Sequence, residues 1–435
     1  MVNDNNQSRQ DTDCRNWDWD EGKRLIAETG NWMEQFEWIE DFKVSPDGEN
    51  IASVVKTGDM EFSVCVNGET WENAFDKIYL LKFGPDGRLT GLVSDTGEWT
   101  VATDGETWES RFDFVWDLKT DKTGKSIAVS AQQGMQYLAA LNDVCWENLY
   151  SNMTHMVLSD DGTKTAGVVQ SVEIKTADIL QFQQGCYSIA VDGEVWDKNF
   201  TNLWEISFNA DSSRVAAEGR LNLYDYTIFV DGKPWNEVFN CIWRPKFDPK
   251  SGSVTAPARI SGKWTLVKDG KPFWKSRFDQ LWHHTYSPDG ANIAAIVAKE
   301  YGRWTIAAND SVWGFTFGDL VTDLVFSPDG KSIAALGKEN EKWTVIVDGK
   351  PWNGVYDMVW APVFSPDGKN VAVRAEKNGV YTVLVNGIPF KETFSQVFDP
   401  VFSPDGKSIL IKGITGGKKE GQYYREVYPL AKILG

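Results

Sequence analysis

Residues Phe326–Phe364 read FSPDGKSIAALGKENEKWTVIVDGKPWNGVYDMVWAPVF, and near-copies of this stretch occur along most of the chain. Within it, Ser327–Gly330 suits a type I turn, because proline fixes φ at its second position and glycine tolerates a positive φ at its end. The pair Asp348-Gly349 lies between two apolar runs and is a hairpin signal. Three runs rich in β-branched and aromatic residues are too short for helices: Ser332–Leu336, Trp343–Val347 and Val355–Val359. The stretch therefore predicts about four short antiparallel strands.

The distance from the aromatic residue after each hairpin signal to the first residue of the next turn is nearly constant. It is 13 residues at Trp32–Ser45, Trp71–Gly84, Trp108–Asp121, Trp146–Ser159, Trp196–Asn209, Trp235–Asp248, Trp274–Ser287, Trp352–Ser365 and Phe390–Ser403. It is 14 residues at Trp313–Ser327. Ten turns thus predict ten repeats of roughly 38 residues each.

The recurring aromatic residues have a physical reason. A unit of four short strands with two or three large aromatic side chains cannot, by itself, bury enough apolar surface to offset the entropy lost on ordering its chain. Each unit must therefore bury its faces against both neighbours. We predict that the following residues pack between neighbouring units: Trp32, Trp71, Trp108, Trp146, Trp196, Trp235, Trp274, Trp313, Trp352 and Phe390.

The two ends of the repeat region favour a closed arrangement. Trp32–Val44 matches the fourth strand of one unit and the first strand of the next. At the other end, second and third strands are expected near Ser408–Lys412 and Gln422–Tyr428, without a fourth. We therefore predict an all-β fold, a β-propeller of about ten four-stranded blades, in which the N-terminal strand completes the last blade and leaves no exposed sheet edge. Because ten exceeds the common number of about four to eight blades, two smaller propellers divided near residue 171 are the alternative.

Residues 1–30 are polar and acidic, whereas residues 31–435 carry the repeats. We expect the first segment to form an acidic N-terminal arm that is partly disordered, and the second to form the propeller. Trp17 and Trp19 are the aromatic exceptions in the arm. They suit a peptide that docks on a partner, although an arm that packs back on the body is the favoured interpretation.

One repeat is longer than the others. From the turn to the next aromatic residue the repeats span 24 to 26 residues, but Ser159 to Trp196 spans 37. The extra residues lie within Ser171–Gly185, SVEIKTADILQFQQG, beside a loop between two strands. Insertions in repeat proteins collect on loops, often on a binding face. The candidate partner-binding residues are therefore Ile174, Ile179, Leu180 and Phe182, and the alternative is a longer hairpin without a function.

Composition narrows the classes of function. The 435 residues include 62 acidic and 44 basic side chains, a net charge of −18, which opposes binding to nucleic acid and to anionic membrane surfaces. No apolar run approaches the ~20 residues of a membrane span. The start, MVNDNNQSRQDTD, has neither a basic nor a hydrophobic region of the kind found in signal peptides, so we expect a cytoplasmic protein. Five scattered cysteines, Cys14, Cys65, Cys145, Cys186 and Cys241, suit reduced thiols.

No catalytic or metal-binding motif is recognisable. The histidine pair His283-His284 has no carboxylate or thiol cluster tied to it by spacing. There is no nucleophile elbow, zinc-protease motif, phosphate-binding loop or dinucleotide-binding motif. Most aspartates in the turns are explained by turn chemistry. We therefore expect a protein that is not an enzyme and has no metal or cofactor, although paired carboxylates for glycoside cleavage and an aromatic groove for sugars stay open.

The units SPDGKSIA and its copies, at Ser327–Ala334, Ser365–Ala372 and Ser403–Ile409, resemble the WD40-like propeller repeats of the TolB type. The likeness covers about Trp32 to the C-terminus. The added element Val347–Trp352, VDGKPW, departs from ordinary repeats of that type. This resemblance implies a propeller and is poor evidence for a function.

An acidic propeller of this length with 21 tryptophans is also similar to the tryptophan-rich subunit of the transmembrane redox complex of sulfate-reducing bacteria. The resemblance implies a subunit with no catalytic residues and no cofactor of its own. It implies as partners a tetrahaem cytochrome, a membrane cytochrome b and a cytoplasmic iron–sulfur protein. The absence of cysteine clusters and of CxxCH in this sequence agrees with a subunit that binds neither an iron–sulfur cluster nor haem.

These observations lead to one expectation about function and two alternatives. We expect a non-catalytic scaffold that docks to redox subunits on the cytoplasmic side of the inner membrane, without a membrane span of its own. The first alternative is a propeller that binds or cleaves carbohydrate. The second is a TolB-like protein of the cell envelope.

Overall fold

The computed structural model describes residues 13–174 and 179–435. It contains ten antiparallel sheets, each with four strand positions, and is a β-propeller of ten blades, as the spacing of the turns predicts. The sheets form two compact units of five, Met1–Glu109 with Phe317–Gly435, and Ser110–Thr316. The boundaries of these units do not fall near residue 171, where the sequence placed the alternative division.

Four sheets of the first unit are built from consecutive strands. They are β2 (Lys43–Val44), β3 (Ile51–Gly58), β4 (Glu61–Val66) and β5 (Glu69–Thr70); β6 (Lys77–Phe83), β7 (Leu89–Asp95), β8 (Glu98–Thr103) and β9 (Glu106–Thr107); β30 (Leu320–Phe326), β31 (Ile333–Glu339), β32 (Lys342–Val347) and β33 (Lys350–Pro351); and β34 (Met358–Val359) with β35 (Val363–Phe364), β36 (Val371–Lys377), β37 (Val380–Val385) and β38 (Ile388–Pro389).

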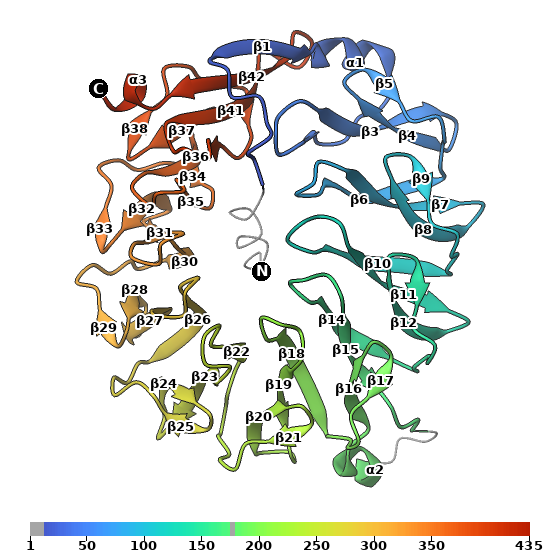
Figure 1. Ribbon diagram of the computed structural model, residues 1–435, viewed down its shortest axis with the longest axis vertical. Helices are drawn as coiled ribbons and strands as arrows, with labels where there is room; N and C mark the ends of the chain where they lie inside the picture. Colours follow the sequence, from blue (N-terminus) through green and yellow to red (C-terminus); the bar gives the residue numbers. More distant parts are fainter. Residues whose placement is uncertain (1–12, 175–178) are drawn as a thin grey trace. The chain divides into compact units, whose positions relative to one another are not determined.

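The fifth sheet of this unit joins the two ends of the chain. It consists of β39 (Gln396–Val397) with β40 (Val401–Phe402), β41 (Ser408–Thr415), β42 (Gln422–Pro429) and β1 (Gly22–Ala27). Figure 1 shows β1, in dark blue, beside β42, in red, and the two strands pair antiparallel. The predicted closure by an N-terminal strand is therefore confirmed.

The segment that closes the last blade differs from the predicted one. Residues 22–27 pair with β42, whereas Trp32 lies in helix α1 (Thr29–Gln35). The strand therefore lies within the segment 1–30, which the sequence assigned to an arm. The prediction failed because the exposed residues of β1 show no alternation of apolar and polar side chains, whereas Trp32 matches the spacing of the other repeats.

The second unit has the same organisation. Its strands are β10 (Phe114–Thr120), β11 (Ile127–Gln133), β12 (Gln136–Leu141) and β13 (Val144–Cys145); β14 (Met153–Leu158), β15 (Thr165–Gln170), β16 (Tyr187–Val191) and β17 (Glu194–Val195); β18 (Asn202–Phe208), β19 (Val215–Arg220), β20 (Tyr226–Val230) and β21 (Lys233–Pro234); β22 (Lys246–Phe247), β23 (Val254–Ile260), β24 (Lys263–Lys268) and β25 (Lys271–Pro272); and β26 (Gln280–Tyr286), β27 (Ile293–Glu300), β28 (Arg303–Ala308) and β29 (Ser311–Val312). Two further helices are α2 (Ile179–Gln184) in this unit and α3 (Ala431–Leu434) in the first.

The repeated motifs fold as their chemistry requires. In the first turn, the Ser327 hydroxyl donates to the Asp329 carboxylate at 2.7 Å and accepts the Ser332 N–H at 2.9 Å. In the hairpin between third and fourth strands, the Asp348 carboxylate accepts the Ile333 N–H at 2.8 Å, which ties the hairpin to the start of the second strand. An Asp or Asn makes the same bond in eight other sheets, at Asn67, Asp104, Asn142, Asp192, Asp231, Asp269, Asn309 and Asn386.

The core lies between neighbouring sheets within each unit. One cluster joins Val54 of β3 to Ile78 and Val93 of the next sheet, with Trp71 packed against it. In the second unit a matching cluster joins Val168 of β15 to residues of β18 and β19. Each blade is thus stabilised by its neighbours, as the size of the repeat predicts. Among the described residues, no helix has the length and apolar character needed to cross a bilayer.

Buried polar side chains fasten the last sheet to the first turn of the neighbouring sheet. The Arg425 guanidinium donates from Nε to the Asp47 carbonyl at 2.8 Å and also bonds the Asp18 carbonyl. The Lys412 ammonium donates to the Pro46 carbonyl at 2.9 Å. The Tyr423 hydroxyl donates to the carbonyl of Gly48, also at 2.9 Å, and burial raises the pKa of Tyr423 well above its usual value. We call these three side chains the closing clamp.

Candidate functional site

The aromatic residues predicted to pack between blades are all buried or half-buried. Trp32, Trp146, Trp274 and Phe390 are buried, and Trp71, Trp108, Trp196, Trp235, Trp313 and Trp352 are half-buried. Their positions explain the glycine of the hairpin signal. A Cβ on Gly193 would lie 3.1 Å from the Trp146 side chain, and one on Gly387 would lie 3.5 Å from Trp352. Glycine thus lets the hairpin of one blade approach the tryptophan of the preceding blade.

The described part of the N-terminal arm, from Asp13 onward, packs on the last sheet. Trp17 and Trp19 stack on each other with ring centroids 6.1 Å apart, and both are half-buried. The Trp19 indole donates to the Cys14 carbonyl at 2.9 Å, and the Cys14 thiol lies 3.8 Å from the Phe402 carbonyl. This arrangement agrees with the interpretation of an arm packed on the body.

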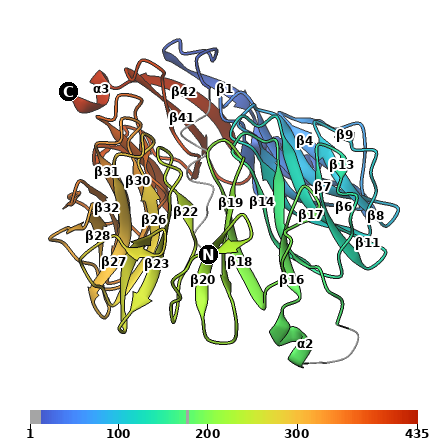
Figure 2. The ribbon, with the colours of Figure 1, turned by 60° about the horizontal axis from the view of Figure 1, so that its bottom comes forward.

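The insertion lies between the second and third strands of the β14 sheet. Helix α2 belongs to it, and Figure 2 shows this helix beyond the end of β16. Of the candidate partner-binding residues, Ile174 and Phe182 are half-buried, whereas Ile179 and Leu180 are 67% and 66% exposed. No residue of α2 is buried. The helix therefore presents two adjacent large aliphatic side chains to solvent.

Other exposed apolar side chains occupy the same position in neighbouring sheets. The hairpin tips between second and third strands of the second unit carry Met135 (83% exposed), Tyr224 (80%) and Tyr301 (91%). Because the sheets of this unit pack on one another in the same strand order, these tips lie along one edge of the unit. We define the tip surface as the described residues of 132–136, 171–185, 221–225, 259–263 and 299–303. The sequence pointed to only one of these five tips, because a single apolar residue in a hairpin is common.

Charge is distributed unequally between the two units. Residues 110–316 contain 24 acidic and 21 basic side chains, so almost all of the net negative charge of the chain belongs to the other unit. The hairpin tips of the first unit carry both signs, with Asp59, Glu61 and Glu98 at two tips and Lys377, Lys418 and Lys419 at two others. The β23–β24 and β27–β28 tips of the second unit are mainly basic, with Arg259, Lys263, Lys299 and Arg303.

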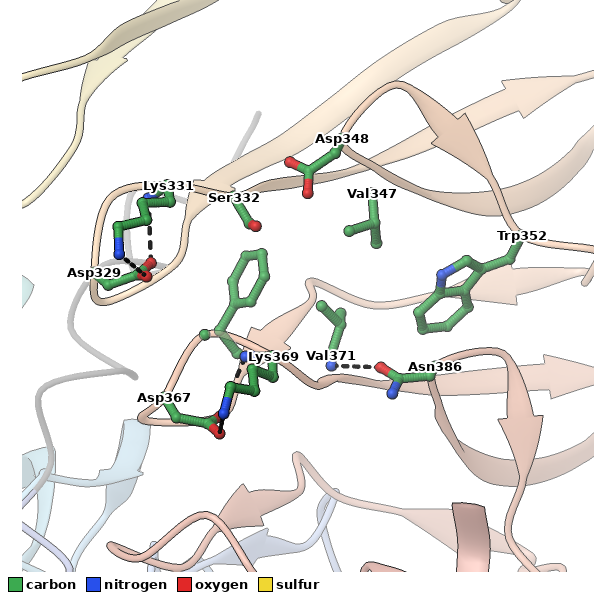
Figure 3. A pocket seen from close by; sticks show the side chains of 12 residues that line it. Asp329, Lys331, Ser332, Val347, Asp348, Trp352, Asp367, Lys369, Val371 and Asn386 are labelled. Carbon is green, nitrogen blue, oxygen red and sulfur yellow. Dashed lines mark hydrogen bonds and ion pairs between the residues drawn. The ribbon is translucent and has the colours of Figure 1, made fainter. Parts of the chain in front are cut away.

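A hollow of about 470 Å³ lies between the β30 and β34 sheets of the first unit. Figure 3 shows that two turns border it, one with Asp329 and Lys331 and the other with Asp367 and Lys369, and that the Trp352 indole lines its far side. Both carboxylates already accept hydrogen bonds within their own turns. The hollow is therefore lined by residues that belong to the repeated turns, and its polar groups do not indicate a particular ligand.

A cluster of charged groups joins Glu205 of β18 and Glu218 of β19 to Arg244, which lies two residues before β22 of the next sheet. The Arg244 guanidinium forms an ion pair with Glu205, at 2.9 Å from Nε and 2.8 Å from Nη2. The Arg244 backbone N–H donates to the Glu218 carboxyl group at 3.0 Å. Burial, followed by the charge of Glu205, raises the pKa of Glu218 to about 8. At neutral pH, Glu218 is therefore mainly protonated beside the ion pair of Glu205 with Arg244, an arrangement suited to acid–base chemistry.

Trp204 lies opposite Glu218 in the pairing of β18 with β19, and further indole rings lie in the two following sheets. The Trp243 ring lies 4.3 Å from Trp264 and 6.5 Å from Trp282, measured between centroids, and Trp282 stacks on Trp304 at 4.3 Å. The side chain of Trp243 hydrogen-bonds the Cys241 thiol, but burial raises the pKa of that thiol. Trp243, Trp282 and Trp304 are all half-buried. Aromatic and charged groups thus meet here through three sheets, a combination that the sequence did not reveal.

The histidines do not form a metal site with their neighbours. His284 is buried, and burial lowers its pKa well below the usual value, so that its imidazole is neutral. His283 lies in a left-handed conformation at φ 48° in the same strand. Within residues 13–174 and 179–435, no group of three or more His, Cys, Asp or Glu side chains is placed to hold a metal ion.

Comparisons with known proteins show similarity in fold and do not identify a family. No protein-family model matches the chain. No curated protein matches it either. Among solved structures, the chain is similar to a eukaryotic initiation factor, with 11% identity over 78% of this chain and 96% of that one and a TM-score of 0.48. It is also similar to the β-propeller domain of the Trilobed protease from Pyrococcus furiosus (15% identity, 63% and 95% covered, TM-score 0.32) and to the Dos1 propeller (12% identity, 93% and 95% covered, TM-score 0.36). These similarities carry no argument about function.

Proposed function

We propose that this propeller is a non-catalytic interaction subunit that holds other proteins together. The observation that carries the proposal is the insertion at α2, where Ile179 and Leu180 are exposed in the one repeat that departs from the common length. Exposed aliphatic side chains on a rigid scaffold suit a protein contact, because burying them on a partner is favourable. The ten-bladed fold supplies such a scaffold.

The finer form of the proposal concerns the assembly. We propose that the partners are redox subunits of a membrane-associated electron-transfer complex, namely an iron–sulfur protein and a membrane cytochrome b, on the cytoplasmic side of the inner membrane. The support for this is the resemblance of the acidic, tryptophan-rich repeats to the propeller subunit of such complexes. On this proposal the chain contributes positioning and no cofactor.

Native purification tests both forms. The full-length chain, with an affinity tag after Gly435, is isolated from its own organism under gentle conditions, and the co-eluting proteins are identified and examined for haem and iron. We expect stoichiometric partners that contain haem or iron–sulfur clusters. If stoichiometric partners co-elute but contain no redox groups, the proposed interaction function is retained and the assignment to a redox complex is rejected. A chain that elutes alone would overturn the whole proposal.

A second candidate function is carbohydrate binding at the Glu205–Arg244–Glu218 cluster. The protonated Glu218 and the Glu205–Arg244 ion pair lie beside the half-buried indole of Trp204, and sugars use both hydrogen-bonding groups and aromatic faces. Glu218 would donate to a sugar oxygen and Glu205 would accept from a hydroxyl. A glycan array probed with the wild-type chain and with Glu218→Gln tests this candidate. Loss of a specific signal in the variant is expected, and an array without signal would remove the candidate.

A further inference from the structure

We propose that the tip surface of the second unit binds a protein whose contact face is apolar at its centre and acidic along one edge. The inference rests on the proposed interaction function and names the chemistry of the partner. It is independent of whether that partner belongs to a redox complex.

The apolar part of the tip surface spans the β11–β12, β15–β16 and β19–β20 tips. Met135, Ile179, Leu180 and Tyr224 are each at least 66% exposed. The described residues around them include six glutamines and only two charged side chains, Glu173 and Asp225; the glutamines are Gln132, Gln133, Gln136, Gln181, Gln183 and Gln184. Such composition is unusual in a chain of which 24% is charged. Methionine and tyrosine with few charges are typical of the centre of protein interfaces.

The basic part lies at the adjoining β23–β24 and β27–β28 tips. Arg259, Lys263 and Lys299 are exposed there, and Tyr301 is the most exposed large apolar residue of the described chain. Lys263 forms an ion pair with Asp279, and Glu300 is the acidic residue within these two tips. The positive charges lie beside the apolar tips and at one end of the row. A partner that covers the whole surface therefore needs acidic residues at the corresponding edge.

A lipid bilayer fits this surface less well than a protein does. The exposed side chains of Gln133, Gln136, Gln183 and Gln184 would lose hydrogen bonds to water in the acyl region of a bilayer, whereas a protein backbone replaces such bonds. The described charged side chains of the three apolar tips, Glu173 and Asp225, are acidic, which also opposes approach to an anionic membrane. Membrane binding is therefore the competing outcome of the test.

Photo-crosslinking in the native organism tests the location of the contact. A benzoyl-phenylalanine is introduced in the full chain in place of Tyr224, in place of Tyr301 or, as a control, in place of Met60, which is exposed at the equivalent tip of the first unit. We expect the first two positions to crosslink to one and the same protein and the control not to do so. The crosslinked peptides of that protein should include apolar residues for Tyr224 and Asp or Glu near the site for Tyr301. A crosslink only to lipid, only to a second copy of this chain, or to nothing, would overturn the inference.

Binding to the identified protein, purified, then measures the two parts of the surface. We expect Tyr224→Ser or the pair Ile179→Ser with Leu180→Ser to weaken binding by about tenfold or more, and Met60→Ser by less than about twofold. Lys299→Glu should weaken binding about three- to tenfold at low salt, with the difference shrinking as salt is added. An effect of Met60→Ser equal to that of Tyr224→Ser, or no effect of either tip variant, would contradict the inference. All these residues are exposed, so circular dichroism and melting should be unchanged.

The outcome separates this inference from the proposed function. If native purification recovers stoichiometric partners and the tip variants retain them, the scaffold proposal stands and the tip surface is not the contact. Co-sedimentation with vesicles of phosphatidylcholine containing a quarter phosphatidylglycerol provides the lipid control. Tip-dependent binding to such vesicles, without a protein crosslink, would assign the surface to a membrane instead.

Discussion

Leu80 lies in the first strand of its sheet with a left-handed backbone, φ 52°, and 56% of its side chain is exposed. The equivalent positions of five other sheets also have positive φ, but carry polar residues: Asp117, His155, Glu205, His283 and Asp323. In all six of these first strands the register shifts between the residue before this position and a residue that follows it, which marks a bulge. The left-handed residue is therefore a feature of the repeat, and leucine is the least suitable occupant among those observed.

We expect Leu80→Asn to stabilise the protein. Asparagine tolerates the left-handed region better than leucine, and the exposed leucine side chain contributes little burial, so the free energy of unfolding should rise by about 0.5–1 kcal/mol. Urea denaturation of both proteins measures the change. Leu149→Asn, at a partly exposed leucine without positive φ, is the control and should be neutral or destabilising. Equal shifts in both variants would contradict the explanation from backbone strain.

Glu218 gives the stability of the protein a specific dependence on pH. Its pKa of about 8 in the folded state lies above the usual value of 4.5. The folded protein therefore holds an additional proton between about pH 4.5 and pH 8, and the contribution of this group to stability is lost as the pH rises through that window. Glu218→Gln removes the titration. The variant should gain roughly 1–3 kcal/mol relative to wild type between pH 5 and pH 9.

Denaturation midpoints at pH 5, 7 and 9 measure this effect. Glu205→Gln is the matched control, because it removes the carboxylate that pairs with Arg244 while leaving Glu218 in place. That variant should lose stability at all three pH values. If wild type and Glu218→Gln change in parallel with pH, the protonated carboxyl group is not present.

At the scale of elements, the hairpin between third and fourth strands links local turn chemistry to packing between blades. Its Asp or Asn side chain bonds the second strand, and its glycine approaches the tryptophan of the preceding blade. Both residue types were readable from the sequence, because the turn itself requires them. Their second role was not readable, since it depends on a contact with another repeat.

Gly193→Ala should therefore destabilise more than the same change at an open turn. Gly193 and Gly97 have nearly equal φ, 87° and 84°, but a Cβ on Gly193 would meet Trp146, whereas one on Gly97 meets nothing within 4 Å. The shared backbone strain costs about 1 kcal/mol, and the contact with Trp146 should add about 1–2 kcal/mol in Gly193→Ala. Thermal melting and urea denaturation of the two variants compare them directly. Equal losses would show that the tryptophan moves aside without cost.

At the scale of the whole molecule, the number and order of blades followed from the sequence because the spacing of 13 residues recurs from one repeat to the next. The tip surface and the Glu218 cluster could not be predicted from the sequence. Glu205 and Glu218 lie in paired strands of one sheet and meet Arg244 only because the next sheet packs against it, and Met135, Tyr224 and Tyr301 share an edge because successive sheets pack together. A repeat fixes which positions are equivalent, whereas function lies in how individual repeats differ.

The stability of the first unit should depend strongly on the closing clamp. Arg425 is 1% exposed and has only backbone carbonyls and Glu49 as its partners in the clamp, at 2.8 Å from Asp47 and 3.0 Å from Glu49. We expect Arg425→Met to lower the free energy of unfolding by about 3 kcal/mol, because the charge-assisted hydrogen bonds from the buried guanidinium to backbone carbonyls are lost. Arg24→Met, at an exposed arginine that also pairs with Glu49, should cost less than about 1 kcal/mol. Similar losses of unfolding free energy in the two variants would contradict a particular contribution of the closing clamp to stability.

The pairing of β1 with β42 also delays completion of the last blade until the end of translation. A ribosome makes β1 about 400 residues before its partner, so at roughly 5–20 residues per second the strand waits from about twenty seconds to more than a minute. During that interval the backbone groups of β1 that later pair with β42 have no strand to pair with, although the blades translated before the last one have already left the exit tunnel. The last blade can assemble only after its final strand has been translated. A chain stalled before Gln422 therefore retains nine blades and an unpaired β1, which chaperones would have to cover.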